Sequence, residues 1–291
     1  MSLLIDSPHA PLEPLHLPQI QHKKIDLFLK REDQSHPFIS GNKWRKLKYH
    51  LLAARQQNKN LLVTFGGAYS NHLLATAAAG AKYQFATHGF VRGEEVSNHM
   101  LKLCLLFGMK LQFVSRTAYL QKEDLFQNYF GSNQNAFYIP EGGSGNLGEQ
   151  GVSEILDEAD MQHFDAIIAS VGTGGTLKGL LQGVQKNQLN TRVHGIVVLK
   201  GAETMNQEYG AYAIESYCLH HQFHGGGYAK TNGALHTFQH KFASQTGIIL
   251  DPVYEAKMMF GLIGLIEQDY FAPGTRICAL HNGGLLGVLS R

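Results

Sequence analysis

The sequence predicts an α/β protein in which mostly parallel sheets are covered by helices on both faces. Along the 291 residues, short runs rich in β-branched and aromatic side chains alternate with helical patterns. Several of these runs end in glycine-rich segments, where a strand would turn into a helix. The chain is long for a single core, so we expect two open, twisted sheets rather than one.

The expected elements follow one another in a regular order. Helical patterns lie between strand patterns, and neither a repeat nor a low-complexity segment interrupts them. Strands are expected at residues 60–65, 83–91, 110–115, 135–143, 165–171, 192–199 and 275–280. Helices are expected after the first, second and fifth of these strands, at residues 73–81, 97–108 and 177–185.

Composition and charge narrow the class of protein. Hydrophobic residues make up 44% and charged residues 16% of the chain, which is a globular composition. The 25 basic and 23 acidic residues nearly balance, which argues against a nucleic-acid or membrane surface held by charge. Three scattered cysteines fit a reducing compartment, and residues 1–15 resemble neither a signal peptide nor a membrane span. We therefore expect a cytoplasmic protein without nucleic-acid or membrane partners.

Lys43 stands on the apolar stripe of an expected helix. Leu47, Leu51 and Ala54 follow it at spacings of four, four and three, so all four side chains share one face. Lys46 lies on another face, which is expected to be solvated. An inward lysine loses hydration, and the neutral amine that burial favours is a nucleophile. The alternative is an aliphatic stem along apolar surface with its ammonium in water.

A glycine-rich strand end within residues 170–179 (SVGTGGTLKG) predicts a phosphate-binding loop. The loop consists of Gly172, Thr173, Gly174, Gly175 and Thr176. The glycines let the backbone approach an anion at the start of a helix, and the threonines add hydroxyl donors. The spacing matches neither a P-loop nor the dinucleotide fingerprint. A tight turn of small residues is the alternative interpretation.

Two further strand ends carry polar side chains. Ser70 and Asn71 follow two glycines within residues 64–80 (TFGGAYSNHLLATAAAG), at the start of an expected helix. They could cap that helix or bind a carboxylate, but the spacing does not match a nucleophile elbow. Asn282 follows the last expected strand, in residues 278–287 (CALHNGGLLG), and would line the same cleft.

Residues 250–268 predict another helix, with Asp251 as its N-cap. Tyr254 and Glu255 then lie in its first turn, where a glutamate is electrostatically ordinary. Tyr228 lies in a glycine-rich loop before this helix.

The chain has 16 histidines, which raises the question of a metal site. His220 and His224 would share one face if residues 220–224 were helical, as pairs of zinc ligands do. No HExxH motif or cysteine partner accompanies them in the sequence, so we expect no metal ion.

Six sequence blocks point to a known family. They occur in the order SGNKWRKLKY, GGAYSNH, EGGS, VGTGGT, DPVYEAK and LHNGG, from about residue 30 to the C-terminus. The chain resembles the 1-aminocyclopropane-1-carboxylate deaminase and D-cysteine desulfhydrase family, which has the fold type II (tryptophan-synthase-β-like) architecture. These enzymes use pyridoxal 5′-phosphate, whose minimum binding constellation is a reactive lysine and a phosphate-binding loop.

The resemblance implies roles in cofactor binding. Lys43 would bond to the cofactor aldehyde, and Asn42 would hydrogen-bond the pyridoxal oxygen. Lys46 would reach the phosphate together with the backbone of residues 172–176. Glu255 would face the pyridine nitrogen and keep it protonated, so that the ring accepts electrons fully.

The resemblance also implies roles in substrate binding. Ser70 and Asn71 would hold the substrate carboxylate, and Ser70 would also serve as a nucleophile or proton relay. Tyr228 and Tyr254 would flank the substrate amine and β-carbon.

Specificity is divided between the two branches of the family. Glu255 is similar to the deaminases, whereas His72 is similar to the desulfhydrases. At residue 282 the deaminases carry leucine and the desulfhydrases threonine, so Asn282 matches neither. Tyr69 and Leu74 replace residues that are usually polar.

We therefore expect a lyase that acts on a small D-amino acid, converting D-cysteine to pyruvate, ammonia and sulfide. The alternative is a 1-aminocyclopropane-1-carboxylate deaminase, classed as a hydrolase, which gives 2-oxobutyrate and ammonia. A phosphate- or nucleotide-binding enzyme without pyridoxal phosphate, and a binding protein that keeps the cofactor, are rivals from other classes.

We expect two domains. Residues 1–50 plus 140–291 would form a larger cofactor-binding domain, and residues 51–139 would form a smaller inserted domain. The cofactor would lie in the cleft, and the assembly would be a homodimer.

Overall fold

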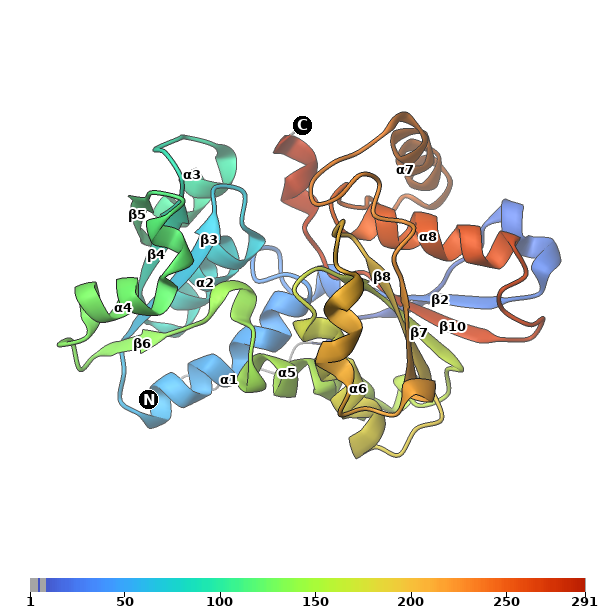
Figure 1. Ribbon diagram of the computed structural model, residues 1–291, viewed down its shortest axis with the longest axis horizontal. Helices are drawn as coiled ribbons and strands as arrows, with labels where there is room; N and C mark the ends of the chain where they lie inside the picture. Colours follow the sequence, from blue (N-terminus) through green and yellow to red (C-terminus); the bar gives the residue numbers. More distant parts are fainter. Residues whose placement is uncertain (1–4, 6–8, 291) are drawn as a thin grey trace. The chain divides into compact units, whose positions relative to one another are not determined.

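The computed structural model describes residue 5 and residues 9–290, and the chain divides into two compact units (Figure 1). The four-stranded unit consists mainly of residues 35–151. The six-stranded unit consists mainly of residues 9–34 and 152–289. The expected domains differ from these units, because residues 35–50 and 140–151 belong to the four-stranded unit. The assignment of cofactor binding to residues 1–50 plus 140–291 stays a prediction.

The four-stranded unit is built on a fully parallel sheet with strand order β5-β4-β3-β6. Its strands are β3 (Leu61–Gly67), β4 (Ala86–Arg92), β5 (Lys110–Val114) and β6 (Ala136–Tyr138). Its helices are α1 (Asn42–Gln56), α2 (Asn71–Tyr83), α3 (His99–Leu106) and α4 (Lys122–Phe130). The boundary between the units falls within α5 (Asn146–Ser153).

Both faces of this sheet are covered, as the alternation of side chains along β3 shows (Figure 1). Leu62 packs in a core with side chains of α1 and α2. Val63 and Phe65 point to the other face and pack with Phe90 and Tyr119. Burial on both faces explains why β3 reads as a continuous apolar run rather than as an alternating one.

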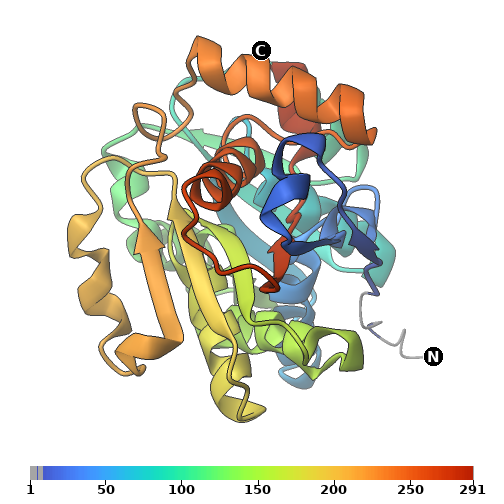
Figure 2. The ribbon, with the colours of Figure 1, turned by 90° about the vertical axis from the view of Figure 1, so that its right-hand side faces the viewer.

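The six-stranded unit has strand order β1-β2-β10-β7-β8-β9, and only the pair β1–β2 among these is antiparallel. Its strands are β1 (Leu12–Pro14), β2 (Asp26–Lys30), β7 (Ala166–Val171), β8 (Arg192–Val197), β9 (Tyr217–His220) and β10 (Arg276–Leu280). Its helices are α6 (Gly175–Lys186), α7 (Gly233–Thr246) and α8 (Glu255–Glu267). In Figure 2, β7, β8 and β9 lie side by side, coloured from yellow-green to orange.

Two separate cores cover the two faces of this sheet. Ala166 and Ile168 of β7 pack on the face that α8 covers, with Met258 among their neighbours. Ile167 and Ala169 point the other way and pack with side chains of α6. The predicted fold class is confirmed: the protein is α/β, with two mostly parallel sheets flanked by helices.

The lysine helix follows the predicted stripe, with one correction. Leu47, Leu51 and Ala54 are buried in the core of the four-stranded unit, while Lys43 is half-buried. Lys46 was expected on a solvated face, but it is buried. A Cβ added at Gly143 or Gly148 would lie within 4 Å of the Lys46 side chain, so the segment at 143–148 covers this part of α1.

Candidate functional site

Gly41 determines where the lysine helix begins. It caps α1 with φ 67° and ψ −153°, a conformation that side-chain-bearing residues rarely adopt. Asn42 and Lys43 are therefore the first two residues of the helix, and Asn42 is buried there. The sequence Ser-Gly-Asn-Lys thus places the Lys43 amine in the first turn, after a glycine that sets the direction of the chain.

Lys46 is a buried lysine on α1, in the four-stranded unit. Its pKa is lowered well below the ordinary value, first by burial, then by the charge of Lys43, while Glu149 acts in the opposite direction. Burial penalises the ammonium form, and a nearby anion would restore it. The environment of Lys46 therefore suits an anionic group supplied by a ligand.

Ser70 and His72 begin the second helix of this unit. The Leu73 N–H donates to Ser70 Oγ at 3.3 Å, which makes Ser70 the N-cap of α2. A Cβ at residue 66 would lie 2.6 Å from Ser70 Oγ, so only glycine leaves room for the serine. Asn71 is the first helical residue and is half-buried.

A chain of hydrogen bonds determines which ring nitrogen of His72 carries the proton. The Thr64 hydroxyl donates to the Ile139 carbonyl at 2.9 Å, and the same oxygen lies 2.8 Å from His72 Nε2. Because the hydroxyl proton is used, Nε2 must be the donor, which leaves Nδ1 as an acceptor. Nδ1 is buried and has no hydrogen-bond partner among the described residues.

The electrostatics around His72 keep its ring neutral. Burial lowers its pKa well below the ordinary value, and the charges of Lys43, His50 and Lys46 lower it further. His72 is therefore an uncharged hydrogen-bond acceptor at neutral pH.

In the six-stranded unit, the predicted phosphate-binding loop joins β7 to α6. Gly174 caps α6 with φ 84°, and no side chain caps the first turn. A Cβ added at Gly172 would lie 3.0 Å from Tyr254 Cε1, so the backbone and the tyrosine ring approach closely. Thr176 is buried in the first turn of the helix. A helix start whose N-cap is a glycine lets the backbone approach an anion closely.

Glu255 is a buried carboxylate at the start of α8. Its Oε1 accepts a hydrogen bond from Ser170 Oγ at 2.9 Å. Its Oε2 is buried and has no partner within the part of the chain that the structure describes. Burial raises the pKa of Glu255 well above its usual value, and Asp251 raises it further, while Ser170 and Asn282 act against the shift. Such an oxygen calls for a donor or a positive charge from a ligand.

Asp251 prepares the start of α8. Its carboxylate accepts from the backbone N–H groups of Val253, Tyr254 and Glu255 at 2.8–3.0 Å. The expected capping role is therefore present, but regular helix begins at Glu255, later than the sequence pattern implied. The three N–H bonds fix the backbone that presents Tyr254 and Glu255.

Asn282 and the two tyrosines lie around the same carboxylate and loop. Asn282 is nearly buried, and its Oδ1 has no partner among the residues described. The rings of Tyr228 and Tyr254 meet edge to face, with centroids 6.0 Å apart. Through Tyr254 and Glu255, the six-stranded unit brings together its predicted residues Gly172, Tyr228 and Asn282.

Two residues that contact the candidate site residues were not predicted from the sequence. Ser170 donates a hydrogen bond to Glu255. Its position as a polar residue inside an otherwise apolar strand, β7, could have indicated a special role. Lys257 is fully buried on α8 and donates to the Gly227 carbonyl at 2.7 Å, so it supports the loop that carries Tyr228. No sequence signal distinguished this lysine from a solvated one.

The histidines after β9 do not form the helical pair considered from sequence. His220 is the last residue of β9, and His224 lies in the following loop, where its Nδ1 accepts from the Gly226 N–H at 2.9 Å. The two rings therefore belong to different local structures.

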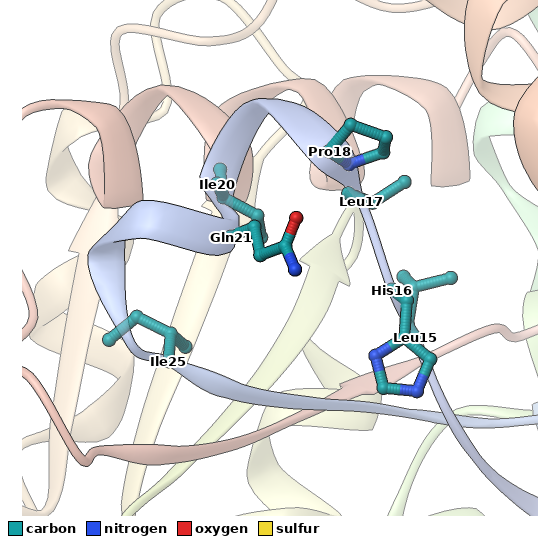
Figure 3. Close-up of a pocket in the computed structure, with 7 residues that line it drawn as sticks. All are labelled: Leu15, His16, Leu17, Pro18, Ile20, Gln21 and Ile25. Carbon is teal, nitrogen blue, oxygen red and sulfur yellow. The ribbon is translucent and has the colours of Figure 1, made fainter.

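The six-stranded unit also has a pocket of about 250 Å³ (Figure 3). It is formed around the 3₁₀ helix Pro18–Lys23 and is lined by Leu15, Leu17, Ile20 and Ile25, among others. None of the candidate site residues lines it, and its walls offer no cluster of charged groups.

Among the described helices, none is long and apolar enough to cross a membrane.

Comparison with known proteins identifies relatives along nearly the whole chain. A family model described as pyridoxal-phosphate dependent enzyme matches residues 7–283. A putative 1-aminocyclopropane-1-carboxylate deaminase of Thermotoga maritima is 32% identical, over 92% of this chain and 91% of that protein. A D-cysteine desulfhydrase of Klebsiella pneumoniae is 29% identical, over 97% of this chain and 93% of the relative.

Other matches bear on substrate and fold. A mitochondrial protein of Arabidopsis thaliana, named as a bifunctional D-cysteine desulfhydrase and 1-aminocyclopropane-1-carboxylate deaminase, is 29% identical over 97% of this chain and 78% of its own length. The crystal structure of an ACC deaminase homologue superposes with a TM-score of 0.82, at 27% identity, over 96% of this chain and 90% of that chain. A fungal L-serine ammonia-lyase from Rhizomucor miehei, at 17% identity and a TM-score of 0.70 over 94% and 93% of the two chains, shares the fold.

Proposed function

The chain belongs to the family of pyridoxal-phosphate dependent enzymes, and from this premise we propose that it is a lyase acting on a small D-amino acid. The proposed reaction is of the D-cysteine desulfhydrase type and releases pyruvate, ammonia and sulfide. Relatives named as desulfhydrases and relatives named as deaminases both match the chain, so the choice depends on its own residues.

The residues of the six-stranded unit fit the cofactor. Glu255 Oε2, buried and without a partner among the described residues, is suited to the protonated ring nitrogen. Gly172, Gly174 and the first turn of α6 are suited to the phosphate, because glycines at a helix start let backbone N–H groups approach an anion. Once bound, pyridoxal phosphate would supply an electron sink for the bond that breaks at the substrate.

Lys43 is the residue that we propose to bond the cofactor aldehyde and later to move a proton. Its position in the first turn of α1 beside Lys46 supports the role, since each charge disfavours the other. With the cofactor bound, the Lys43 Nζ would take the proton from the substrate Cα. Lys46, buried one turn further on, would regain its charge by pairing with the phosphate. Asn42 would hydrogen-bond the pyridoxal oxygen.

Ser70 and Asn71 are proposed to hold the substrate carboxylate. Both lie at the N-terminus of α2, where the helix dipole favours an anion. Tyr228 and Tyr254 are proposed to flank the substrate amine and β-carbon. Tyr228 is half exposed, whereas Tyr254 contacts the phosphate-binding loop.

His72 is the observation that favours D-cysteine. Its Nδ1 is a buried, neutral acceptor that the protein leaves without a hydrogen bond among the residues described. The thiol of D-cysteine can donate to such an atom, whereas the ring of the cyclopropane acid carries no donor at its β-carbons. A site with an unused acceptor discriminates against a substrate that cannot satisfy it.

Glu255 supports a second candidate, 1-aminocyclopropane-1-carboxylate deaminase activity. A buried carboxylate at the ring nitrogen favours the strongest electron withdrawal, which suits a substrate that has no Cα proton and must lose one at a β-carbon. The products would be 2-oxobutyrate and ammonia. Asn282, beside Glu255, distinguishes this chain from either branch and is proposed to contact the substrate.

Assembly and location are further proposals. We propose a homodimer in the cytoplasm, on the balanced charge and the cysteine content of the sequence and on the resemblance to the family. Light scattering of the purified enzyme tests the first proposal, and a monomer would contradict it.

A nucleotide-binding enzyme without pyridoxal phosphate is set aside, because the family match covers residues 7–283.

The function is tested by assaying keto acid, ammonia and sulfide with D-cysteine, D-serine, L-serine and 1-aminocyclopropane-1-carboxylate. We expect pyruvate and sulfide from D-cysteine at the highest kcat/KM. A Lys43→Ala variant should lose turnover and the visible absorbance of the bound cofactor, whereas Lys48→Ala on the same helix should keep both. Production of 2-oxobutyrate alone would support the second candidate, and activity with L-serine alone would contradict both.

A further inference from the structure

Three side chains with metal-binding atoms meet on one face of the six-stranded sheet. His194 lies on β8, and Cys218 and His220 lie on the neighbouring edge strand β9. The parallel register pairs His194 with Cys218, and His220 follows two residues later on the same face of β9. Figure 2 shows β9, in orange, at the edge of this sheet.

The distances suit a common ligand. One potential donor atom from each of the three residues lies within 4.8 Å of the other two. His194 Nδ1 and His220 Nε2 are 3.1 Å apart, and the two rings are nearly parallel, with 15° between their planes. Nitrogen ligands at about 2.0–2.1 Å from a tetrahedral zinc ion are roughly 3.3 Å from each other, so little movement is needed.

The surroundings favour the forms that bind metals. His194 and His220 are 3% and 5% exposed, and burial favours the neutral imidazole, which has a free lone pair. The Tyr270 hydroxyl donates to Cys218 Sγ at 3.6 Å, which helps to hold the sulfur in place. Cys218 is only half-buried, so an ion could enter from the sheet edge.

We propose that His194, Cys218 and His220 form a binding site for one divalent cation of the zinc class. Two imidazoles and a thiolate are typical ligands for zinc, and the absence of a carboxylate from the three donors argues against magnesium and calcium. Binding would release the thiol proton to solvent. The proton shared in the hydrogen bond between His194 Nδ1 and His220 Nε2 would move to the other nitrogen of its own ring, so that both rings offer a lone pair, and water would take the fourth position. The ion would tie the edge strand β9 to β8 through bonds stronger than the present hydrogen bond.

The site is separate from the proposed catalytic residues. None of Lys43, Ser70, Tyr228, Tyr254 or Glu255 belongs to it, so zinc binding and turnover can be measured independently. The competing interpretation is that the histidine pair only satisfies its own hydrogen bond and that Cys218 packs as a small apolar residue. Metal binding by the purified enzyme separates the two interpretations.

The experiment uses the cofactor-loaded enzyme, freed of excess cofactor and stripped of metal by a chelator, in a buffer without thiols. Equilibrium dialysis against Zn²⁺ with metal analysis should give one ion per chain. Substitution with Co²⁺ should give the intense visible bands of a tetrahedral site and a thiolate charge-transfer band.

Variants assign the ion to these residues. His194→Ala and Cys218→Ser should weaken zinc binding by at least about 10- to 100-fold, because even outer partners of metal ligands contribute that much. Tyr270→Phe should weaken it less. His240→Ala, an exposed histidine, and Cys104→Ala, a cysteine in the other unit, should bind zinc as the wild type does.

Circular dichroism and the cofactor absorbance check that each variant is folded. The proposal is overturned if the wild type binds no zinc at one equivalent. It is equally overturned if folded Cys218→Ser and His194→Ala variants bind the ion as tightly as the wild type.

Discussion

At the scale of single residues, two buried groups dominate the chemistry that the site can perform. Glu255 has one oxygen on Ser170 and another without a partner among the described residues, so its energy is unfavourable until a ligand supplies a positive charge. His72 has the opposite character, because it is held neutral and offers a lone pair. Each group is incomplete in the protein alone, which is characteristic of binding sites.

Glu255→Gln tests the role of the carboxylate. Glutamine keeps the shape and a hydrogen bond to Ser170 but removes the negative charge, so the ring nitrogen would no longer be held protonated. We expect kcat to fall about 100-fold, the size of effect typical for losing one electrostatic partner of the reacting group. Steady-state kinetics with D-cysteine and cofactor absorbance check this, with Ser170→Ala expected to show a smaller loss. Wild-type turnover in the glutamine variant would exclude Glu255 from the chemistry.

The stability of the protein should depend on pH through His50, a buried residue of the four-stranded unit. Burial lowers its pKa from 6.5 to about 4, so between these values the unfolded chain binds a proton that the folded chain does not. Stability should therefore fall as the pH drops from 6.5 to 4, and His50 should contribute about 3 kcal/mol to that loss.

The measurement is chemical denaturation of the wild type and His50→Gln at several pH values across this range. Glutamine has no charge to acquire, so the stability of this variant should depend less steeply on pH. Parallel pH profiles for the two proteins would show that His50 titrates alike in both states.

At the scale of elements, glycines allow α5 and the segment before it to pack closely on α1. A Cβ added at Gly151 of α5 would lie 1.9 Å from the Arg45 carbonyl oxygen of α1. A Cβ at Gly148 would lie 1.9 Å from the Gly143 carbonyl oxygen. These close contacts explain how Lys46 becomes buried although several of its neighbours in the sequence are polar.

Gly151→Ala should destabilise the protein by about 1–3 kcal/mol or more, because the methyl group must push two backbone segments apart. Gly233→Ala in α7 is the matched control, since nothing lies within 4 Å of a Cβ there. Urea denaturation measures both variants. Equal stability of the two alanine variants would contradict the packing of α5 on α1.

At the scale of the whole molecule, the cofactor should contribute to stability as well as to chemistry. A ligand that binds only the folded chain stabilises it by about 2.7 kcal/mol at a free concentration of 100 times its Kd. We expect the melting temperature of the wild type to rise when pyridoxal phosphate is added to the cofactor-free enzyme. Lys43→Ala, which lacks the covalent bond, should gain much less in thermal unfolding, and an equal gain in both would argue against Lys43 as the bonded residue.

Sequence alone predicted the fold class, the stripe of Leu47, Leu51 and Ala54, and the glycine loop between β7 and α6. These features are local, since a period of two or 3.6 residues and a glycine cluster can be seen within one short window. The motif blocks also indicated the family that the comparisons identify.

Only the tertiary structure decided which polar residues meet. Ser170 and Glu255 are 85 positions apart in the chain, and His194 and His220 are 26 apart, yet hydrogen bonds join both pairs. Burial of Lys46 likewise depends on a segment 100 residues further along the chain. Strand register and helix packing set these contacts, and neither is encoded in the periodicity of a single segment.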